Sequence, residues 1–324
     1  MIGALRIARG LHANGVVGIN ERNAEYTLPY NPRNRYPLVD DKLITKQYAD
    51  KAGVAVPPLY GVVEIQRQVL GLAAQLAPYR EFVVKPCRGS QGDGIVVVTG
   101  RSRNQYEVAD GTFMNDEEMG FHVSNILSGI FSLGGQPDKA LIEYRVNFDP
   151  VFAKITFRGV PDIRIIVFLG VPVMAMVRLP TRMSRGKANL HQGAVGTGVD
   201  MATGVTTTAV WKERLVDTHP DTGNPVAGVA IPNWGRLLDI AARSYELTGL
   251  GYQGIDIVLD SIRGPLVLEL NARPGLAIQL ANRRGLGKRL DAVRADHQRL
   301  TSVQARVDYA RERFSAEATR PAGG

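Results

Sequence analysis

Lys85 and the small residues after it have the types and spacing needed to hold phosphate, in the segment KPCRGSQGDGIVVV. The small residues are Gly89, Ser90, Gly92 and Gly94. A lysine supplies a fixed cation, and glycines let backbone N–H groups approach a ligand closely. The segment lacks the ending of a Walker A loop, and a strand rather than a helix follows it, which excludes the dinucleotide fingerprint. It predicts a phosphate-binding hairpin, with a flexible loop and an exposed lysine as the alternative.

A second set of residues could bind a metal ion, in the segment GIDIVLD…GPLVLELNARPG. Glu269 and Asn271 are two apart on a predicted strand, so both face one side, and Asp256 lies on the strand before. Carboxylate and amide oxygens are the ligands that Mg²⁺ prefers. Charged residues inside apolar strands are costly unless they are paired or bind metal. The alternative is that Asp256 or Glu269 pairs with Arg273 or another basic residue.

Strands and helices must position both sets. Apolar runs predict strands at 81–86 and 94–98, which form an antiparallel hairpin, and at 139–146, 162–170, 171–179, 252–260 and 264–271. Capping and periodicity predict helices at 40–53, 62–76, 116–130 and 233–249. The first forty residues are interpreted as an irregular or extended arm, and 180–228 as a long functional or mobile loop. Adjacent hairpins mixed with helices predict the α+β class.

Composition narrows the class of protein. The 324 residues are 44% hydrophobic and 22% charged, which is ordinary for a globular protein. No apolar run is long enough to span a bilayer, and the N-terminus lacks a secretory signal. Cys87 is the single cysteine, which excludes an intramolecular disulfide and a multi-cysteine metal cluster. These features favour a cytoplasmic protein without a membrane partner.

The chain is basic, with a net charge of +8 and a pI of about 9.6. Ten lysine and arginine residues against five acidic ones follow Asn282, so most of the excess lies away from both sets of residues. A solvated basic helix explains this better than a polyanion site, and nucleic acid is disfavoured as the main partner. The polar C-terminal helix and the N-terminal arm could serve a homodimer or a partner chain.

A resemblance to a known superfamily rests on an ordered set of motifs: KPxxGSxGxGI, IEY, DIR, NLHQG and GID…ELNxRPG. In this order and spacing they resemble the ATP-grasp superfamily, and within it the α-L-glutamate ligase-related branch, similar to the ligases that add glutamate to ribosomal protein tails. The similarity covers about residues 41–282. It implies an α+β ATP-grasp fold with a nucleotide between two α+β subdomains. The expected parts are an arm at 1–40, a lid subdomain at 41–145, a metal-binding subdomain at 146–286 and a basic helix and tail at 287–324.

The resemblance also implies the cofactors and their ligands. ATP phosphate would contact Lys85 and Lys42, with Lys46 as the alternative to Lys42, and the lid would consist of Gly89, Ser90, Gly92 and Gly94. Glu143 would accept a hydrogen bond from the adenine amino group, with backbone contacts from Tyr144 and Val146. The alternative for Glu143 is a surface salt bridge with Arg145. The ligands of Mg²⁺, or of Mn²⁺ in its place, would be Asp256, Glu269 and Asn271.

The candidate catalytic residues are Arg164, Arg178, Arg273, Asn189 and His191. Arg164 and Arg178 lie among apolar neighbours, where a guanidinium needs an anionic partner, and a carboxylate, a phosphate or an acyl-phosphate transition state would each serve. Arg273 would reach the transferred phosphoryl group, and Asn189 would position the acceptor or the γ-phosphate. His191 is either a general base for the amine or a structural histidine. Cys87 is expected to be a small buried residue and not a nucleophile.

The predicted activity is that of an ADP-forming carboxylate-amine ligase. The carboxylate would attack the γ-phosphate of MgATP to give an acyl phosphate, and an amine would then displace phosphate to form an amide. Arginines in the predicted site favour glutamate, a peptide or a protein tail as substrate. Many such ligases carry an N-terminal α/β domain, whereas about forty irregular residues precede Asp41, so the arm, a partner chain or the acceptor itself would supply that surface. The alternative function is a nucleotide-binding module without turnover.

Overall fold

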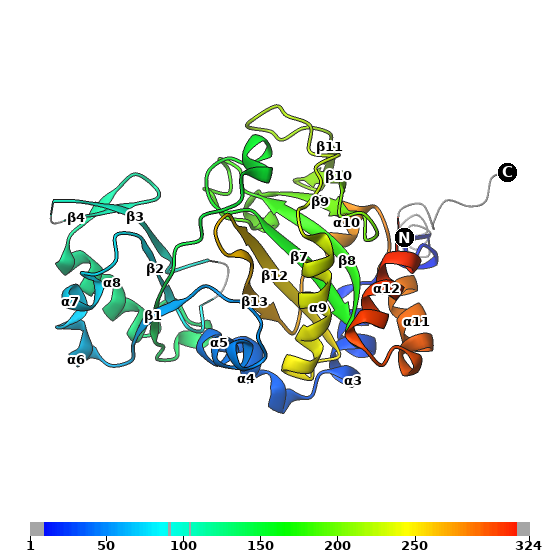
Figure 1. Ribbon diagram of the computed structural model, residues 1–324, viewed down its shortest axis with the longest axis horizontal. Coiled ribbons are helices and arrows are strands. Elements are labelled where there is room, and N and C mark those ends of the chain that lie inside the picture. The colour runs from blue at the N-terminus through cyan, green and yellow to red at the C-terminus, as the bar shows by residue number, and fades with distance from the viewer. Residues whose placement is uncertain (1–9, 90–91, 104, 316–324) are drawn as a thin grey trace, which may run out of the picture. The chain divides into compact units, whose positions relative to one another are not determined.

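Figure 1 shows the computed structural model, which describes residues 10–89, 92–103 and 105–315. The chain divides into two units. The small unit comprises Asp40–Lys51 and Ala55–Asn147, and the large unit comprises Met1–Val39, Ala52–Val54 and Phe148–Gly324. Each unit combines one antiparallel sheet with helices, so the predicted α+β class is confirmed. Within the described ranges, no helix has the length and apolar character needed to cross a bilayer.

The small unit contains a six-stranded sheet in the order β1-β6-β2-β3-β4-β5. The strands are β1 (Leu59–Val63), β2 (Phe82–Pro86), β3 (Val96–Ser102), β4 (Gln105–Val108), β5 (Phe113–Met114) and β6 (Ala140–Glu143). The helices are α5 (Lys42–Lys51), α6 (Gln66–Val69), α7 (Leu72–Leu76) and α8 (Asp116–Leu127), with a 3₁₀ turn η3 at Leu133–Gly135. The predicted hairpin of β2 and β3 is confirmed by the pairing of Phe82 with Val98.

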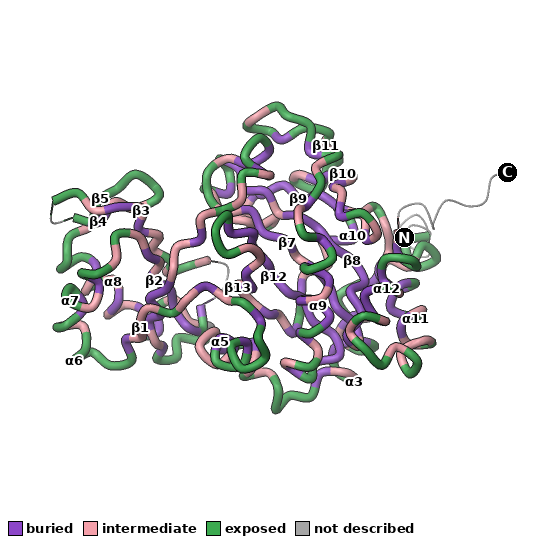
Figure 2. The backbone as a smooth tube through the Cα atoms, viewed as in Figure 1, coloured by how far each residue is buried: buried purple, intermediate pink, exposed green. Residues whose placement is uncertain are grey.

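Apolar side chains on one face of this sheet form the core of the small unit. Phe82, Val84 and Ile142 are fully buried and pack with Met119 and Val123 of α8. Asn115 caps α8, since its side chain accepts a hydrogen bond from Glu118 N, and the helix begins at Asp116 as predicted. Figure 2 shows the mostly buried strand β2 of this unit beside exposed loops. The predicted single helix at 62–76 is wrong, because its first residues form edge strand β1 and the rest forms the two short helices α6 and α7.

The large unit contains a seven-stranded sheet in the order β11-β10-β9-β8-β7-β12-β13. The strands are β7 (Asp162–Phe168), β8 (Val171–Leu179), β9 (Val195–Val199), β10 (Thr206–Trp211), β11 (Arg214–Val216), β12 (Tyr252–Asp260) and β13 (Gly264–Asn271). The later helices are α9 (Trp234–Thr248), α10 (Ile278–Asn282), α11 (Gly287–Asp296) and α12 (Val303–Arg313), with 3₁₀ turns η4 (Pro150–Ile155), η5 (Leu190–Gln192) and η6 (His297–Arg299). Helix α9 crosses the sheet and packs on β7, β8 and β12 (Figure 1).

The N-terminal segment is helical, which corrects the expectation of an irregular or extended arm. It consists of α2 (Ile19–Glu21), a π-helical turn η1 (Arg22–Thr27), α3 (Leu28–Tyr30), η2 (Arg33–Arg35) and α4 (Pro37–Asp40). Asn31 donates to the carbonyl oxygens of Tyr252 and Ala272, at 2.6 and 3.1 Å, and Tyr26 and Tyr30 pack edge-on against Phe168. The segment is therefore fixed to the large sheet by buried contacts, which sequence periodicity does not reveal.

Residues 180–228 also differ from the expected loop, because β9, β10 and β11 lie within them. These strands extend the large sheet beyond β8. Strand β9 reads VGTGV and β10 reads TTTAVW, so glycine and threonine stand where apolar residues would normally mark a strand. Pairing with β8 determines their conformation, and this tertiary contact is absent from the local sequence.

Candidate active site

Three buried charged residues meet in the small unit. Lys46 Nζ lies 2.7 Å from Glu143 Oε2, and Lys85 Nζ forms an ion pair with Glu143 Oε1. Lys46 also donates to the carbonyl oxygen of Pro57 at 2.7 Å. Glu143 ends β6 and Lys85 lies on the neighbouring strand β2, so sheet pairing brings them together, while α5 delivers Lys46. We call these residues the lysine cluster.

The lysine cluster carries a surplus of positive charge. Burial disfavours the ionised carboxylate, but Lys85 and Lys46 outweigh this and hold the pKa of Glu143 below its ordinary value of 4.5. Burial lowers the pKa of Lys46 to about 8; Glu143 opposes this change, and repulsion from Lys85 adds to it. Two ammonium groups therefore share one carboxylate out of water, which favours an anionic ligand.

The lysine cluster includes the alternative residue Lys46, whereas Lys42 lies elsewhere. Lys42 Nζ donates to the carbonyl oxygen of Gly89 at 2.6 Å, on the glycine-rich loop. The interpretation of Glu143 as a surface partner of Arg145 is wrong, because Glu143 is buried and Arg145 pairs with Glu81 at 2.8 Å.

The chain after Glu143 leaves strand β6 and stays attached to the small unit. Tyr144 N donates to the carbonyl oxygen of Pro58 at 2.9 Å, and Val146 is buried. The roles of Tyr144 and Val146 in base recognition stay predictions.

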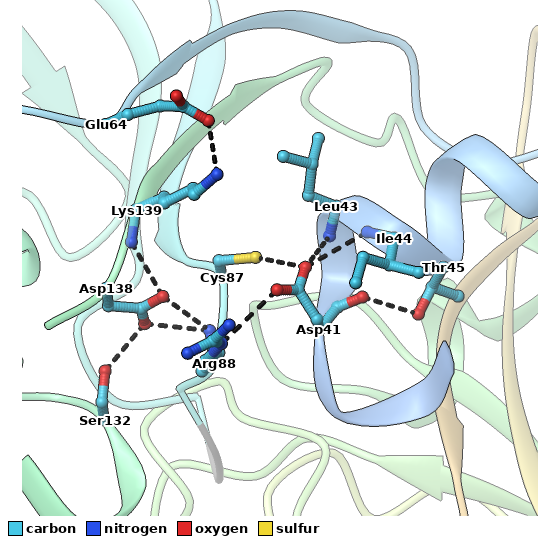
Figure 3. Close-up of polar contacts among 10 residues, drawn as sticks. All are labelled: Asp41, Leu43, Ile44, Thr45, Glu64, Cys87, Arg88, Ser132, Asp138 and Lys139. Atoms are coloured by element: carbon cyan, nitrogen blue, oxygen red, sulfur yellow. Dashed lines mark hydrogen bonds and ion pairs between the residues drawn. The ribbon is translucent and has the colours of Figure 1, made fainter. Parts of the chain in front are cut away.

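Asp41 connects helix α5 to the start of the glycine-rich loop (Figure 3). Its carboxylate accepts hydrogen bonds from Leu43 N and Ile44 N, at 3.0 and 3.1 Å, and so caps α5. The same carboxylate accepts the Cys87 thiol at 2.9 Å and pairs with Arg88 Nε at 3.4 Å. The helix that carries Lys46 is thereby fixed to the strand end that carries Lys85.

Asp138 holds the loop from the other side (Figure 3). Its carboxylate accepts hydrogen bonds from Arg88 N at 2.9 Å, Ser132 Oγ at 2.8 Å and Lys139 N at 2.8 Å. Gly89 pairs with Ser132 in an antiparallel bridge. Sequence reasoning missed both aspartates. The helix predicted at 40–53 begins two residues too early, because α5 starts at Lys42 and Asp41 is the residue that caps it.

Cys87 is a buried structural residue, as predicted. Burial, together with the hydrogen bond to Asp41, raises the pKa of its thiol to about 12. A thiol with this pKa stays protonated near neutral pH and is a poor nucleophile.

The described glycines of the loop have distinct requirements, while Ser90 lies outside the described residues. Gly92 and Gly94 take positive φ angles of 75° and 73°. A Cβ atom at Gly94 would lie 2.5 Å from the ring of Phe131, and a Cβ atom at Gly89 would lie 2.3 Å from Pro86 Cγ. Gly94 therefore needs both left-handed backbone and an absent side chain.

Gly94→Ala is expected to lower the free energy of unfolding by about 2 to 4 kcal/mol, from left-handed strain plus overpacking against Phe131. Gly111→Ala is the matched control, because Gly111 has a φ of 93° but no atom near its missing Cβ. The control should lose only about 1 to 2 kcal/mol. Urea unfolding measures both, and equal losses would show that the Phe131 contact is unimportant.

Four charged residues form a row on one face of the large sheet. Arg164 stands opposite Asp256, and Asp162 stands opposite Arg178. Arg164 donates two hydrogen bonds to Asp256, at 2.7 and 2.6 Å. Arg178 donates two to Asp162, both at 2.5 Å, and a third to Asp256 at 2.8 Å. We call Asp162, Arg164, Arg178 and Asp256 the ion row.

The two aspartates of the ion row differ in charge balance. Burial disfavours both carboxylates, but Asp256 faces two guanidinium groups, which lower its pKa to about 2. Burial raises the pKa of Asp162 to about 6; Arg178 opposes this change, while repulsion from Asp256 adds to it. Burial also lowers the pKa of Arg178, but attraction to Asp162 and Asp256 outweighs burial, so the pKa of Arg178 is raised. Asp256 is therefore the firmly ionised member of the row.

The predicted metal ligands share one face of the sheet. Asp256 stands opposite Glu269, and Asn271 stands opposite Gly254, two positions along. Asn271 Nδ2 lies 3.5 Å from Asp256 Oδ2. The alternative prediction, that Asp256 pairs with a basic residue, also holds. The residues that pair with its oxygens are Arg164 and Arg178, and not Arg273.

A divalent cation suits this oxygen set, because Asp256 is ionised while Glu269 and Asn271 are half-buried and reachable. The ion would compete with two guanidinium groups for Asp256. In the part of the chain that the structure describes, no group of three or more histidine, cysteine, aspartate or glutamate side chains could hold a metal.

Comparison with known families identifies the chain. Residues 21–295 match the model of the family described as sugar-transfer associated ATP-grasp. The chain belongs to this ATP-grasp family. The predicted superfamily and fold are thereby confirmed.

Solved structures include remote neighbours of this ATP-grasp chain. The ATP-grasp ligase PsnB complexed with a minimal precursor is 16% identical over 82% of this chain and 63% of that chain, with a TM-score of 0.44. The D-cycloserine synthetase DcsG is 17% identical over 83% and 73%, with a TM-score of 0.43. The N5-carboxyaminoimidazole synthetase from Staphylococcus aureus complexed with ADP is 13% identical over 74% and 46%, with a TM-score of 0.42.

This chain therefore spans less than two thirds of the length of the PsnB chain. A comparison with curated protein sequences gives no match.

The remaining candidate catalytic residues of this ATP-grasp chain take no part in the hydrogen bonds of the ion row. Arg273 is exposed and lies over the ring of Tyr36, 5.4 Å from its centroid. Asn189 Oδ1 accepts His191 N at 3.0 Å and so starts the turn η5. The His191 side chain is exposed. Asn189 therefore has a structural role, and the catalytic role of His191 stays a prediction.

Proposed function

We propose that this ATP-grasp protein is an ATP-dependent ligase that activates a carboxylate as an acyl phosphate and joins it to an amine, releasing ADP. The observation that carries the proposal is the lysine cluster, in which Lys46 and Lys85 share one buried carboxylate, Glu143. Its surplus positive charge suits the phosphates of a nucleotide. The family match over residues 21–295 supports the same ligand class.

In the small unit, we assign Lys46 and Lys85 to the phosphates of ATP. Lys46 is preferred to Lys42 because it belongs to the lysine cluster, whereas Lys42 donates to Gly89 O. Gly89, Gly92 and Gly94 would bring backbone N–H groups to the same phosphates. Glu143 would orient both lysines and accept from the adenine amino group, beside backbone contacts from Tyr144 and Val146.

In the large unit, Asp256, Glu269 and Asn271 would hold Mg²⁺, which neutralises phosphate charge when bound. Arg164 and Arg178 would fix Asp256 in one orientation through their short hydrogen bonds. Arg273 is free of the ion row and exposed, so its guanidinium could bind the transferred phosphoryl group or a substrate carboxylate. Exposed His191 would accept the proton of the attacking amine.

The substrate we propose is glutamate or a peptide, as in the glutamate ligase-related branch that the motifs resemble. The description of the matched family adds sugar transfer, so amino sugars and sugar acids are further candidates. A nucleotide-binding module without turnover is the second candidate. One observation favours it: arginines already bind both Asp256 oxygens. A metal ion would have to displace these arginines or share the carboxylate with them.

Calorimetry with MgATP tests the proposal, followed by ADP release across a panel of amino acids, peptides and amino sugars. We expect saturable MgATP binding, and ADP release with at least one carboxylate and amine pair. Glu269→Ala should lower turnover by about a hundredfold or more, because metal positioning provides much of the catalysis in phosphoryl transfer. Glu213→Ala, which changes an exposed turn residue, is the control and should leave turnover unchanged.

Binding without ADP release from any pair would establish the module without turnover. Absence of MgATP binding would overturn both functions.

A further inference from the structure

A second concave site lies in the large unit, away from the ion row. Its volume is about 310 Å³, and its lining includes Asp200, Thr207, Thr208, Arg283, Arg284 and Arg289. Strand β10 supplies the threonines, the chain after α10 supplies two arginines, and α11 supplies the third. None of the ion row or the predicted metal ligands lines it. We call it the arginine pocket.

Arg289 is a buried cation held by two carbonyl oxygens and an aromatic ring. It donates to the carbonyl oxygens of Val173 at 2.6 Å and Phe314 at 3.1 Å. Its guanidinium also lies over the Phe314 ring, 5.1 Å from the centroid. Carbonyl dipoles and a ring face orient the group without cancelling its charge. The Arg289 charge therefore adds to the potential inside the arginine pocket.

The other charges in the arginine pocket do not restore neutrality. Burial lowers the pKa of Arg289 to about 10, and repulsion from Arg284 adds to this, while Asp200 opposes it. Asp200 also accepts backbone N–H groups of Ala202 and Thr203, at 3.1 and 2.9 Å, which fixes its carboxylate at the turn after β9. The lining thus holds three guanidinium groups and one carboxylate, so its own side chains carry a surplus of positive charge that favours an anion.

The shape of the donor set indicates the kind of anion. Arg283 projects from the end of α10, where its φ of 50° places it in the left-handed region, and its side chain is exposed. Guanidinium forks bind the oxygens of phosphate in pairs. The Thr207 hydroxyl can add a neutral donor, whereas the Thr208 hydroxyl donates to the carbonyl oxygen of Ala281 at 2.6 Å. A volume of about 310 Å³ is at the small end of ligand pockets, so the site suits a compact molecule.

We propose that the arginine pocket binds the phosphate group of a small molecule, at a site separate from the ATP site. This inference does not depend on the proposed ligase activity. The shared chemistry is the phosphate group, which could come from inorganic phosphate or from a phosphate ester of a hydroxylated small molecule.

Calorimetry on the full chain tests the proposal with three probes: inorganic phosphate, glucose 1-phosphate and malonate. The pocket variant is Arg283→Gln with Arg284→Gln, both residues at the rim and not in the core. The control variant is Arg214→Gln with Arg236→Gln, which removes the same charge from exposed positions. Thr207→Val is a second pocket variant that removes a hydroxyl without changing charge.

We expect the wild type and the control variant to bind at least one phosphate probe with equal affinity. The pocket arginine variant should weaken that binding by about tenfold or more, and Thr207→Val by about threefold. Preference for glucose 1-phosphate would identify an ester as the source, and preference for inorganic phosphate would identify the free ion. No binding, binding of malonate alone, or equal binding in the pocket and control arginine variants would each overturn the proposal.

Discussion

Glu143→Gln is expected to destabilise the protein by about 3 to 5 kcal/mol, because it removes the carboxylate that Lys46 and Lys85 share. Glutamine keeps the shape of the side chain but leaves two ammonium groups buried without an anion. The variant should also lose nucleotide binding, since the lysines would no longer be held in place. Urea unfolding at pH 7 and calorimetry with MgATP measure the two effects.

The matched control is Glu81→Gln, which removes a half-exposed ion pair with Arg145 at 2.8 Å and should cost less than about 1 kcal/mol. The pKa of Glu143 is lower in the folded protein than its ordinary 4.5, so its stabilising effect is present above pH 4.5 and is lost as the pH falls further. The difference between wild type and variant should shrink in that acidic range. Equal, pH-independent losses in both variants would refute the buried-charge explanation.

Asp256→Asn is expected to destabilise the large unit by about 3 to 5 kcal/mol, because Arg164 would lose its anionic partner. Arg178 would retain Asp162, so the loss falls mainly on Arg164. Unfolding measured in the presence of a metal chelator isolates this effect from any metal ion. ADP release by the same variant should fall by about a hundredfold or more if Asp256 also holds Mg²⁺.

Asp239→Asn is the control for the ion row, since it removes an exposed helical pair with Arg243 at 2.8 Å. Its cost should be less than about 1 kcal/mol. The double variant Asp256→Leu with Arg164→Met should recover part of the stability, because it removes both charges together. A chelator-treated Asp256→Asn protein as stable as the wild type would contradict the ion row's structural role.

The elements that position the site could be predicted wherever an apolar pattern determined local structure. Strands β2, β7, β8, β12 and β13 each carry an apolar run, and helix α8 carries its own cap, so both were predicted near their observed bounds. Strands β9 and β10 were missed because glycine and threonine form them only through pairing with β8. The N-terminal helices were missed because buried contacts such as that of Asn31 with Tyr252 determine their fold.

The sequence predicts which residues form the candidate site, but it does not predict which of them pair with one another. A guanidinium among apolar residues needs an anion, and this reasoning predicted a partner for Arg164 and Arg178. The partners are Asp256 and Asp162, and Asp162 could have been found because it lies two residues before Arg164 on the same strand face. The choice between Lys42 and Lys46 depends on which turn of α5 faces β2, which sequence spacing alone does not determine.

Cys87 also gives this protein a practical property. Cys87 is the single cysteine of the sequence, and its thiol is buried and protonated. Maleimide reagents should therefore not react with it under mild conditions. Surface cysteines introduced one in each unit would then carry fluorescent dyes without any need to remove the native residue. Energy transfer between such dyes would measure the distance between the two units with and without MgATP.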